Sequence, residues 1–72
     1  MKKVFALEDL GCANCAAKME EAIRRLEGVE SAGVNFMTRK LTIAAPDHLF
    51  DSVLEQAVRI VKKIEPDCAV VL

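Results

Sequence analysis

The chain has no tryptophan or tyrosine and only three phenylalanines, so aromatic side chains contribute little to its interior. Hydrophobic residues nevertheless make up 53% of its 72 residues, and most of them are aliphatic. A chain of this length buries roughly 60% of the surface that its unfolded form exposes, which allows one modest core. We therefore expect a single domain over residues 1–72, with an aliphatic core and no room for a separate catalytic domain.

The sequence also lacks a surplus of charge of either sign. Ten basic residues stand against eleven acidic ones, for a net charge of −1. There is no basic stripe of the kind that binds nucleic acid and no polybasic cluster that would hold a membrane surface. We therefore expect no nucleic-acid partner and no direct membrane contact by this domain.

Long apolar runs are absent as well, and none approaches the ~20 residues needed to span a bilayer. The run Val4–Leu7 follows two lysines, but Glu8 and Asp9 end it well short of the core of a signal peptide. The three cysteines, a close pair and a distant third, do not form the even set typical of secreted disulfide proteins. Reduced thiols and a cytoplasmic location are therefore expected.

Hydrophobic periodicity predicts six elements in the order strand, helix, strand, strand, helix, strand. Helical spacing runs over residues 13–26 and 47–64, and strand patterns stand at 3–8, 29–36, 39–44 and 68–72. Gly28 is expected to cap the end of the first helix, Asp47 the start of the second, and Met37-Thr38 to join the middle strands. The order predicts an α+β fold, a ferredoxin-like βαββαβ sandwich with a four-stranded antiparallel sheet and two helices on one face.

The alternating connections of such a sheet bring three loops to one end, formed by residues 9–15, 37–38 and 64–67. The turn 26–29 and the loop 45–49 then lie at the other end. Residues of the first three loops are thus candidates for one common site.

Cys12 and Cys15 stand in the first of these loops, where a predicted strand turns into a predicted helix. The two intervening residues let both sulfurs converge on one point. The first helical turn offers free N–H groups and the positive end of its dipole, which stabilise thiolates. Because thiolates bind soft metals or exchange disulfides, this pair is the candidate functional site.

The run Gly-Cys-Ala-Asn-Cys-Ala-Ala-Lys-Met-Glu at residues 11–20, set in a βαββαβ pattern, resembles the heavy-metal-associated (HMA) domain, and the resemblance covers the whole chain. Such domains are small metallochaperones or N-terminal modules of heavy-metal-transporting P-type ATPases. The resemblance implies that Cys12 and Cys15 bind a soft metal ion and pass it on by ligand exchange. The implied partners are a metal-donor or metal-acceptor protein or other domains of the same transporter. It implies a monomer without catalytic residues of its own.

Leu10 favours a divalent ion over copper, because copper members of the family usually carry Met two residues before the first cysteine. The residues of the motif are more similar to those of zinc, cadmium and lead transporters. Zn²⁺ or Cd²⁺ is therefore the expected ion, Pb²⁺ is a further candidate, and Cu⁺ is the alternative. Zn²⁺ and Cd²⁺ take a fuller shell than two thiolates supply, whereas Cu⁺ is satisfied by sulfur alone. Asp9 is the nearest candidate for the carboxylate that completes this coordination shell, although the family often places an acidic residue at the position of Gly11. Glu65 and Asp67, in the neighbouring loop, could take the place of Asp9 as the ligand.

Four other sulfur or imidazole side chains are expected to have structural roles. Cys68 lies in an apolar strand, where a free cysteine behaves as a small buried hydrophobe. Met19 belongs to the core stripe of its helix, and Met37 is expected to pack in the hairpin, with a thioether contact to Cu⁺ as the alternative. His48 is expected on the surface at the opposite end.

A thiol–disulfide oxidoreductase is the competing interpretation, because two cysteines separated by two residues at a helix start also form the thioredoxin-type motif. Gly11 replaces the aromatic residue usually found beside that motif. A parallel central pair of strands would favour the redox interpretation, and an antiparallel sheet favours the metal site. A metal-sensing module without a transport role would use the same cysteines.

Overall fold

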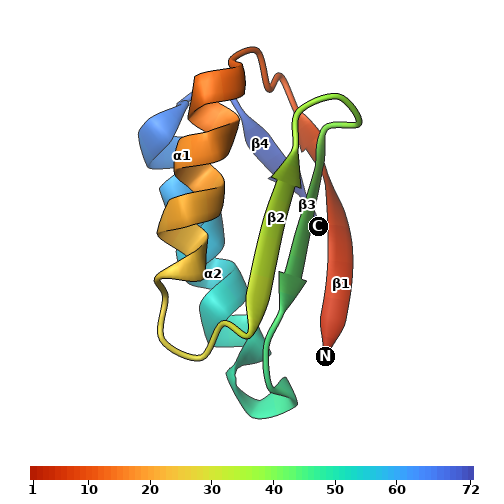
Figure 1. Ribbon diagram of the computed structural model, residues 1–72, viewed down its shortest axis with the longest axis vertical. Coiled ribbons are helices and arrows are strands. Elements are labelled where there is room, and N and C mark those ends of the chain that lie inside the picture. Colours follow the sequence, from red (N-terminus) through yellow and green to blue (C-terminus); the bar gives the residue numbers. More distant parts are fainter.

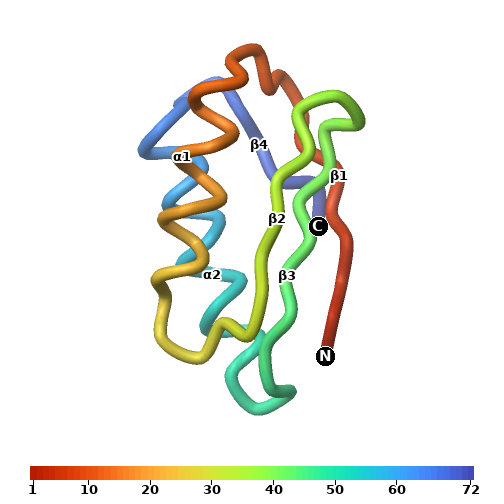
Figure 2. The backbone as a smooth tube through the Cα atoms, in the orientation of Figure 1, coloured from red at the N-terminus to blue at the C-terminus, as the bar shows by residue number.

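The computed structural model describes residues 1–72 and has the element order that the sequence predicts (Figure 1). The elements are β1 (Lys2–Glu8), α1 (Ala13–Arg24), β2 (Ser31–Asn35), β3 (Lys40–Ala44), α2 (Asp47–Ile64) and β4 (Ala69–Val71). The strands form one sheet in the order β2-β3-β1-β4, and every pairing is antiparallel. Figure 2 shows both helices on the same side of this sheet. The ferredoxin-like α+β prediction is confirmed.

The core lies between the helices and the sheet. Strand β1 is central, with Phe5 opposite Leu41 of β3 and Leu7 opposite Val70 of β4, so alternate residues of the strands face the helices. The fourteen buried residues are all hydrophobic: Leu7, Leu10, Ala16, Met19, Ile23, Ala32, Leu41, Ile43, Ala45, Phe50, Val53, Ala57, Val61 and Cys68. Phe5 and Phe50 stack with ring centroids 6.5 Å apart, Phe36 packs against the core, and most of the other core residues are aliphatic, as expected. Neither helix is long and apolar enough to cross a membrane.

The end of α1 differs from the prediction. The helix ends at Arg24 with Arg25 as its cap, and the Arg25 N–H is shared between the carbonyls of Glu21 and Ala22. Gly28 lies further along, with a φ of +93° that side chains rarely adopt. A Cβ atom there would also stand only 2.9 Å from the Leu49 Cδ1 atom. Gly28 therefore serves the turn toward β2 and not the helix cap.

The start of α2 also differs. Asp47 is the first residue of the helix and Pro46 is its cap, with no side-chain hydrogen bond to the free N–H groups. The Asp47 carboxylate lies 3.0 Å from the N-terminal ammonium group of Met1 instead. A carboxylate in the first helical turn still suits the positive end of the helix dipole.

The hairpin between β2 and β3 is longer than the predicted two-residue connection, because residues 36–39 form its turn. The Asn35 Oδ1 atom accepts hydrogen bonds from the N–H groups of Met37, at 2.9 Å, and Thr38, at 3.1 Å. Arg39 closes the turn with a φ of +56°. A connection without Asn-Gly uses a longer loop ended by a left-handed residue to match the twist of the strands. The prediction that Met37 packs in the hairpin was also wrong, because its side chain is 86% exposed.

Three strands are shorter than predicted, and β3 begins at Lys40 and not at Arg39. Strand β2 begins at Ser31 and not at Val29, and β4 covers only Ala69–Val71.

Candidate metal-binding site

Three loops meet at the end of the sheet that lies at the top of Figure 1, as the predicted topology requires. They are the β1–α1 loop, the β2–β3 hairpin and the α2–β4 loop. The Leu7 N–H donates to the Arg39 carbonyl at 2.8 Å, and the Gly11 N–H donates to Glu65 Oε1 at 3.1 Å. The Gly11 contact therefore ties the loop that carries the cysteines to the α2–β4 loop, and the Leu7 contact ties the end of β1 to the hairpin.

Cys12 caps the N-terminus of α1 with its sulfur. Its backbone is extended, with φ −136° and ψ 119°, and its Sγ atom accepts a hydrogen bond from the Cys15 N–H at 3.3 Å. This is the position where Ser, Thr, Asp or Asn usually satisfies a free helical N–H. Both cysteines are free and half-buried, and Cys15 packs against the edge of the core. The two sulfurs thus meet at the positive end of a helix.

The two thiols are electrostatically unequal. The pKa of Cys12 is lowered, chiefly because the Cys15 thiol donates to its sulfur, and the backbone N–H groups of Cys15 and Asn14 add to this effect. The pKa of Cys15 is raised, first because its thiol donates to Cys12, then by burial and by the nearby negative charges of Cys12 and Glu65. Cys12 is therefore the first thiolate to form, and Cys15 holds the proton longer.

Glu65 lies directly after α2 and brings a carboxylate to the cysteines. Its Oε1 atom accepts from Gly11, while its Oε2 atom is buried and has no hydrogen-bond partner. Its negative charge adds to the raised pKa of Cys15 and Cys68, and it only partly offsets the hydrogen bonds that lower the pKa of Cys12. A buried carboxylate oxygen without a partner is costly, so this oxygen is available to a cation. The sequence indicated Glu65 only as a substitute for Asp9.

Asp9 is exposed and has a φ of +59°, in the left-handed region that Asp and Asn adopt more readily than most residues. With Glu65, Asp67 and Arg39 it lines a depression of about 580 Å³. The three acids named from the sequence are therefore brought to one place. Arg39 was missed, because nothing in a hairpin sequence shows that its carbonyl will meet β1 or that it will line the same depression as these acids. No three His, Cys, Asp or Glu side chains stand close enough together to hold an ion in this conformation.

The other residues singled out from the sequence lie in the core or away from the cysteines. Leu10, considered above only as a replacement for Met, is fully buried and anchors the cysteine loop in the core. Cys68 and Met19 are buried as expected, and burial raises the pKa of Cys68. His48 is exposed in the first turn of α2, away from the cysteines.

A family model described as "Heavy-metal-associated domain" matches residues 4–69, and the chain belongs to this family. It is 31% identical over 70 residues to a cadmium, zinc and cobalt-transporting ATPase of Bacillus subtilis (strain 168), which covers 97% of this chain and 10% of that protein. It is 36% identical over 55 residues to copper-transporting ATPase 1 of Rhizobium meliloti (strain 1021), covering 76% of this chain and 7% of that protein. The chain thus spans a tenth or less of the length of these relatives.

Among solved structures, the CopZ metallochaperone superposes with a TM-score of 0.73 at 22% identity, over 99% of this chain and 100% of that one. This likeness supports the fold. The family comprises metal-binding modules that are not themselves catalytic. The antiparallel sheet also lacks the parallel central pair that would favour a thioredoxin-type redox function.

Proposed function

We propose that this domain binds one soft divalent ion, Zn²⁺, Cd²⁺ or Pb²⁺, through Cys12 and Cys15, as a metal-binding module of a heavy-metal-transporting P-type ATPase. The observation that carries the proposal is the convergence of two thiols at the N-terminus of α1, in a loop to which the Glu65 carboxylate is hydrogen-bonded through Gly11. Two thiolates with a carboxylate form a mixed sulfur–oxygen set that suits these ions. The matched relatives include a transporter of cadmium, zinc and cobalt, which supports this choice.

Transfer would proceed by ligand exchange. Both cysteines are free and half-buried, so thiolates of a partner protein or of another domain of the same transporter can reach the ion. The partner's thiolates enter open coordination positions while Cys12 and Cys15 leave one after the other. Cys15, with the raised pKa, regains its proton first. The ion moves on the cytosolic side without release into water.

The third ligand is the part of the proposal that needs the sharpest test. Asp9 is the ligand proposed from the sequence, but its left-handed backbone provides a conformational reason for an aspartate at this position. Glu65 has stronger support, because one of its oxygens is buried without a partner and its charge acts on both thiols. We therefore place Glu65 first and Asp9 second.

Competition titrations of Glu65→Gln, Asp9→Asn and Asp67→Asn with Cd²⁺ and with Cu⁺ test these roles. Each substitution removes a charge and keeps the shape, and Asn keeps the left-handed preference at position 9. Loss of a true third ligand should weaken Cd²⁺ binding by about tenfold and leave Cu⁺ unchanged. Asp67→Asn tests the third carboxylate of the same depression in the same way. Equal losses for both ions, or none for Cd²⁺ in all three variants, would contradict the mixed shell.

Cu⁺ is the second candidate, favoured by the relationship to a copper-transporting ATPase. A copper site would bind through the two thiolates alone, because Cu⁺ is satisfied by sulfur ligands. In that case none of the three carboxylate variants would lose affinity for either ion, because no carboxylate completes the site, and Cu⁺ would displace Cd²⁺ from the unmodified chain.

A further inference from the structure

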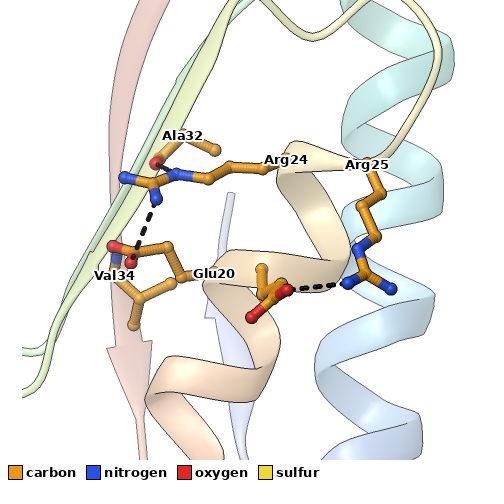
Figure 3. A network of polar contacts seen from close by, with 6 residues as sticks. Glu20, Arg24, Arg25, Ala32 and Val34 are labelled. Atoms are coloured by element: carbon orange, nitrogen blue, oxygen red, sulfur yellow. Dashed lines mark hydrogen bonds and ion pairs between the residues drawn. The ribbon is translucent and has the colours of Figure 1, made fainter.

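Strand β2 lies at one edge of the sheet and pairs only with β3. Two of its outward-directed backbone groups are nevertheless bonded, and α1 supplies both partners (Figure 3). The Val34 N–H donates to Glu20 Oε1 at 2.9 Å, and the Arg24 Nε–H donates to the Ala32 carbonyl at 2.9 Å. These are groups to which a strand added beyond β2 would bond.

A neighbouring pair on the same helix shows that these contacts are specific. Glu21 and Arg25 have the same residue types and the same spacing, one position further along α1. Their ion pair is close, at 2.7 Å, whereas Glu20 and Arg24 lie 3.8 Å apart. The Glu20 side chain is 30% exposed and the Glu21 side chain 68%. Glu20 and Arg24 are thus directed at the backbone of β2, while Glu21 and Arg25 pair with each other in solvent.

We propose that Glu20 and Arg24 close the outer edge of β2 against a strand from a second copy of this chain. An edge strand with unpaired N–H and C=O groups is a template for such pairing. An incoming strand would have to displace two hydrogen bonds, one to a carboxylate and one from a guanidinium, and such charge-assisted bonds are stronger than neutral ones. The opposite edge, β4, has only three residues, and a short edge strand is a poor template. The device keeps the domain monomeric and does not depend on metal binding.

The test compares Glu20→Ala/Arg24→Ala with the matched control Glu21→Ala/Arg25→Ala, both without metal. At protein concentrations too low for association, exchange of the Val34 amide hydrogen in the first variant should accelerate about tenfold or more relative to the β2–β3 ladder amides, because its hydrogen bond is gone. Sedimentation equilibrium at increasing protein concentration should then detect a dimer. The control variant should keep native exchange at Val34 and remain a monomer. A first variant with fast Val34 exchange that stays monomeric would overturn the proposal.

Two further variants locate the contact. Val34→Pro removes the outward N–H, and proline is tolerated on the free side of an edge strand, so adding it to the double variant should abolish the dimer. A dimer that persists with Val34→Pro would use another surface and would also overturn the proposal. The variant Glu20→Gln, with Arg24 unchanged, keeps an acceptor oxygen. It should keep both the native protection of the Val34 amide hydrogen from exchange and the monomer. If the double variant does not fold, Glu20→Ala alone is compared with Glu21→Ala under the same criteria.

Discussion

The two helices lie on the same face of the sheet, but different contacts hold them there. Helix α2 has 18 residues and is held by apolar packing of Phe50, Val53, Ala57 and Val61, without any side-chain cap. Helix α1 has 12 residues, and it adds to its own buried stripe the Cys12 cap at one end and the Glu20 and Arg24 contacts near the other.

This difference separates stability from function. The apolar stripe of α2 makes the larger contribution to the core, while the first turn of α1 stays half-exposed with its two thiols. Side chains of the candidate site can therefore be changed at little cost to the fold. Core side chains of α2 cannot.

The largest effect on stability is expected from a substitution in α2. Phe50→Ala removes a buried ring that stacks on Phe5 and should lower the free energy of unfolding by about 3–5 kcal/mol. Urea unfolding followed by circular dichroism measures this loss. A loss below about 1 kcal/mol would mean that α2 does not carry the core as described.

A smaller effect on stability is expected from a substitution at Cys68. Cys68→Val keeps an apolar side chain of similar volume in a fully buried position, so the free energy of unfolding should change by less than about 1.5 kcal/mol. Its affinity for Cd²⁺ should stay within about threefold of the native value, or roughly 0.7 kcal/mol. A greater loss of affinity would make Cys68 a ligand.

The cap of α1 should contribute about 1 kcal/mol, because Cys12→Ala leaves the Cys15 N–H without its partner. Cys12→Ser provides a hydroxyl oxygen at the same position and serves as the matched control, with a smaller loss. Urea unfolding of both variants without metal measures the difference. Equal stability of the Ala and Ser variants would show that the sulfur does not act as a cap.

The two unequal thiols should differ in their rates of alkylation. Thiolates react and thiols do not, so the rate for each cysteine rises as the pH rises through its pKa. Because the pKa of Cys12 is lowered and that of Cys15 raised, iodoacetamide should modify Cys12 first and at lower pH. Peptide mapping by mass spectrometry over a pH series identifies the site. Faster modification of Cys15 at neutral pH would reverse the assignment.

The fold and the cysteine pair were predictable because periodicity and spacing are local properties of the chain. The contacts around the pair were not. Glu20 with Arg24 and Glu21 with Arg25 are indistinguishable in the sequence, and only the position of β2 decides which pair meets backbone. Likewise Leu10 was considered for its place in the motif, while its burial depends on how the loop returns to the core. The Glu65 contact with Gly11 joins residues 54 positions apart.

The central claim is that Cys12 and Cys15 hold the metal and that the fold does not require them. Cd²⁺ titration of Cys12→Ser/Cys15→Ser, with Cys68 intact, tests this claim most directly through the ultraviolet absorbance of thiolate–cadmium bonds. We expect no such absorbance in this variant and a native circular dichroism spectrum, while Cys68→Val titrates like the native chain. Absorbance that still saturates at one equivalent of Cd²⁺ in the double variant would contradict the account.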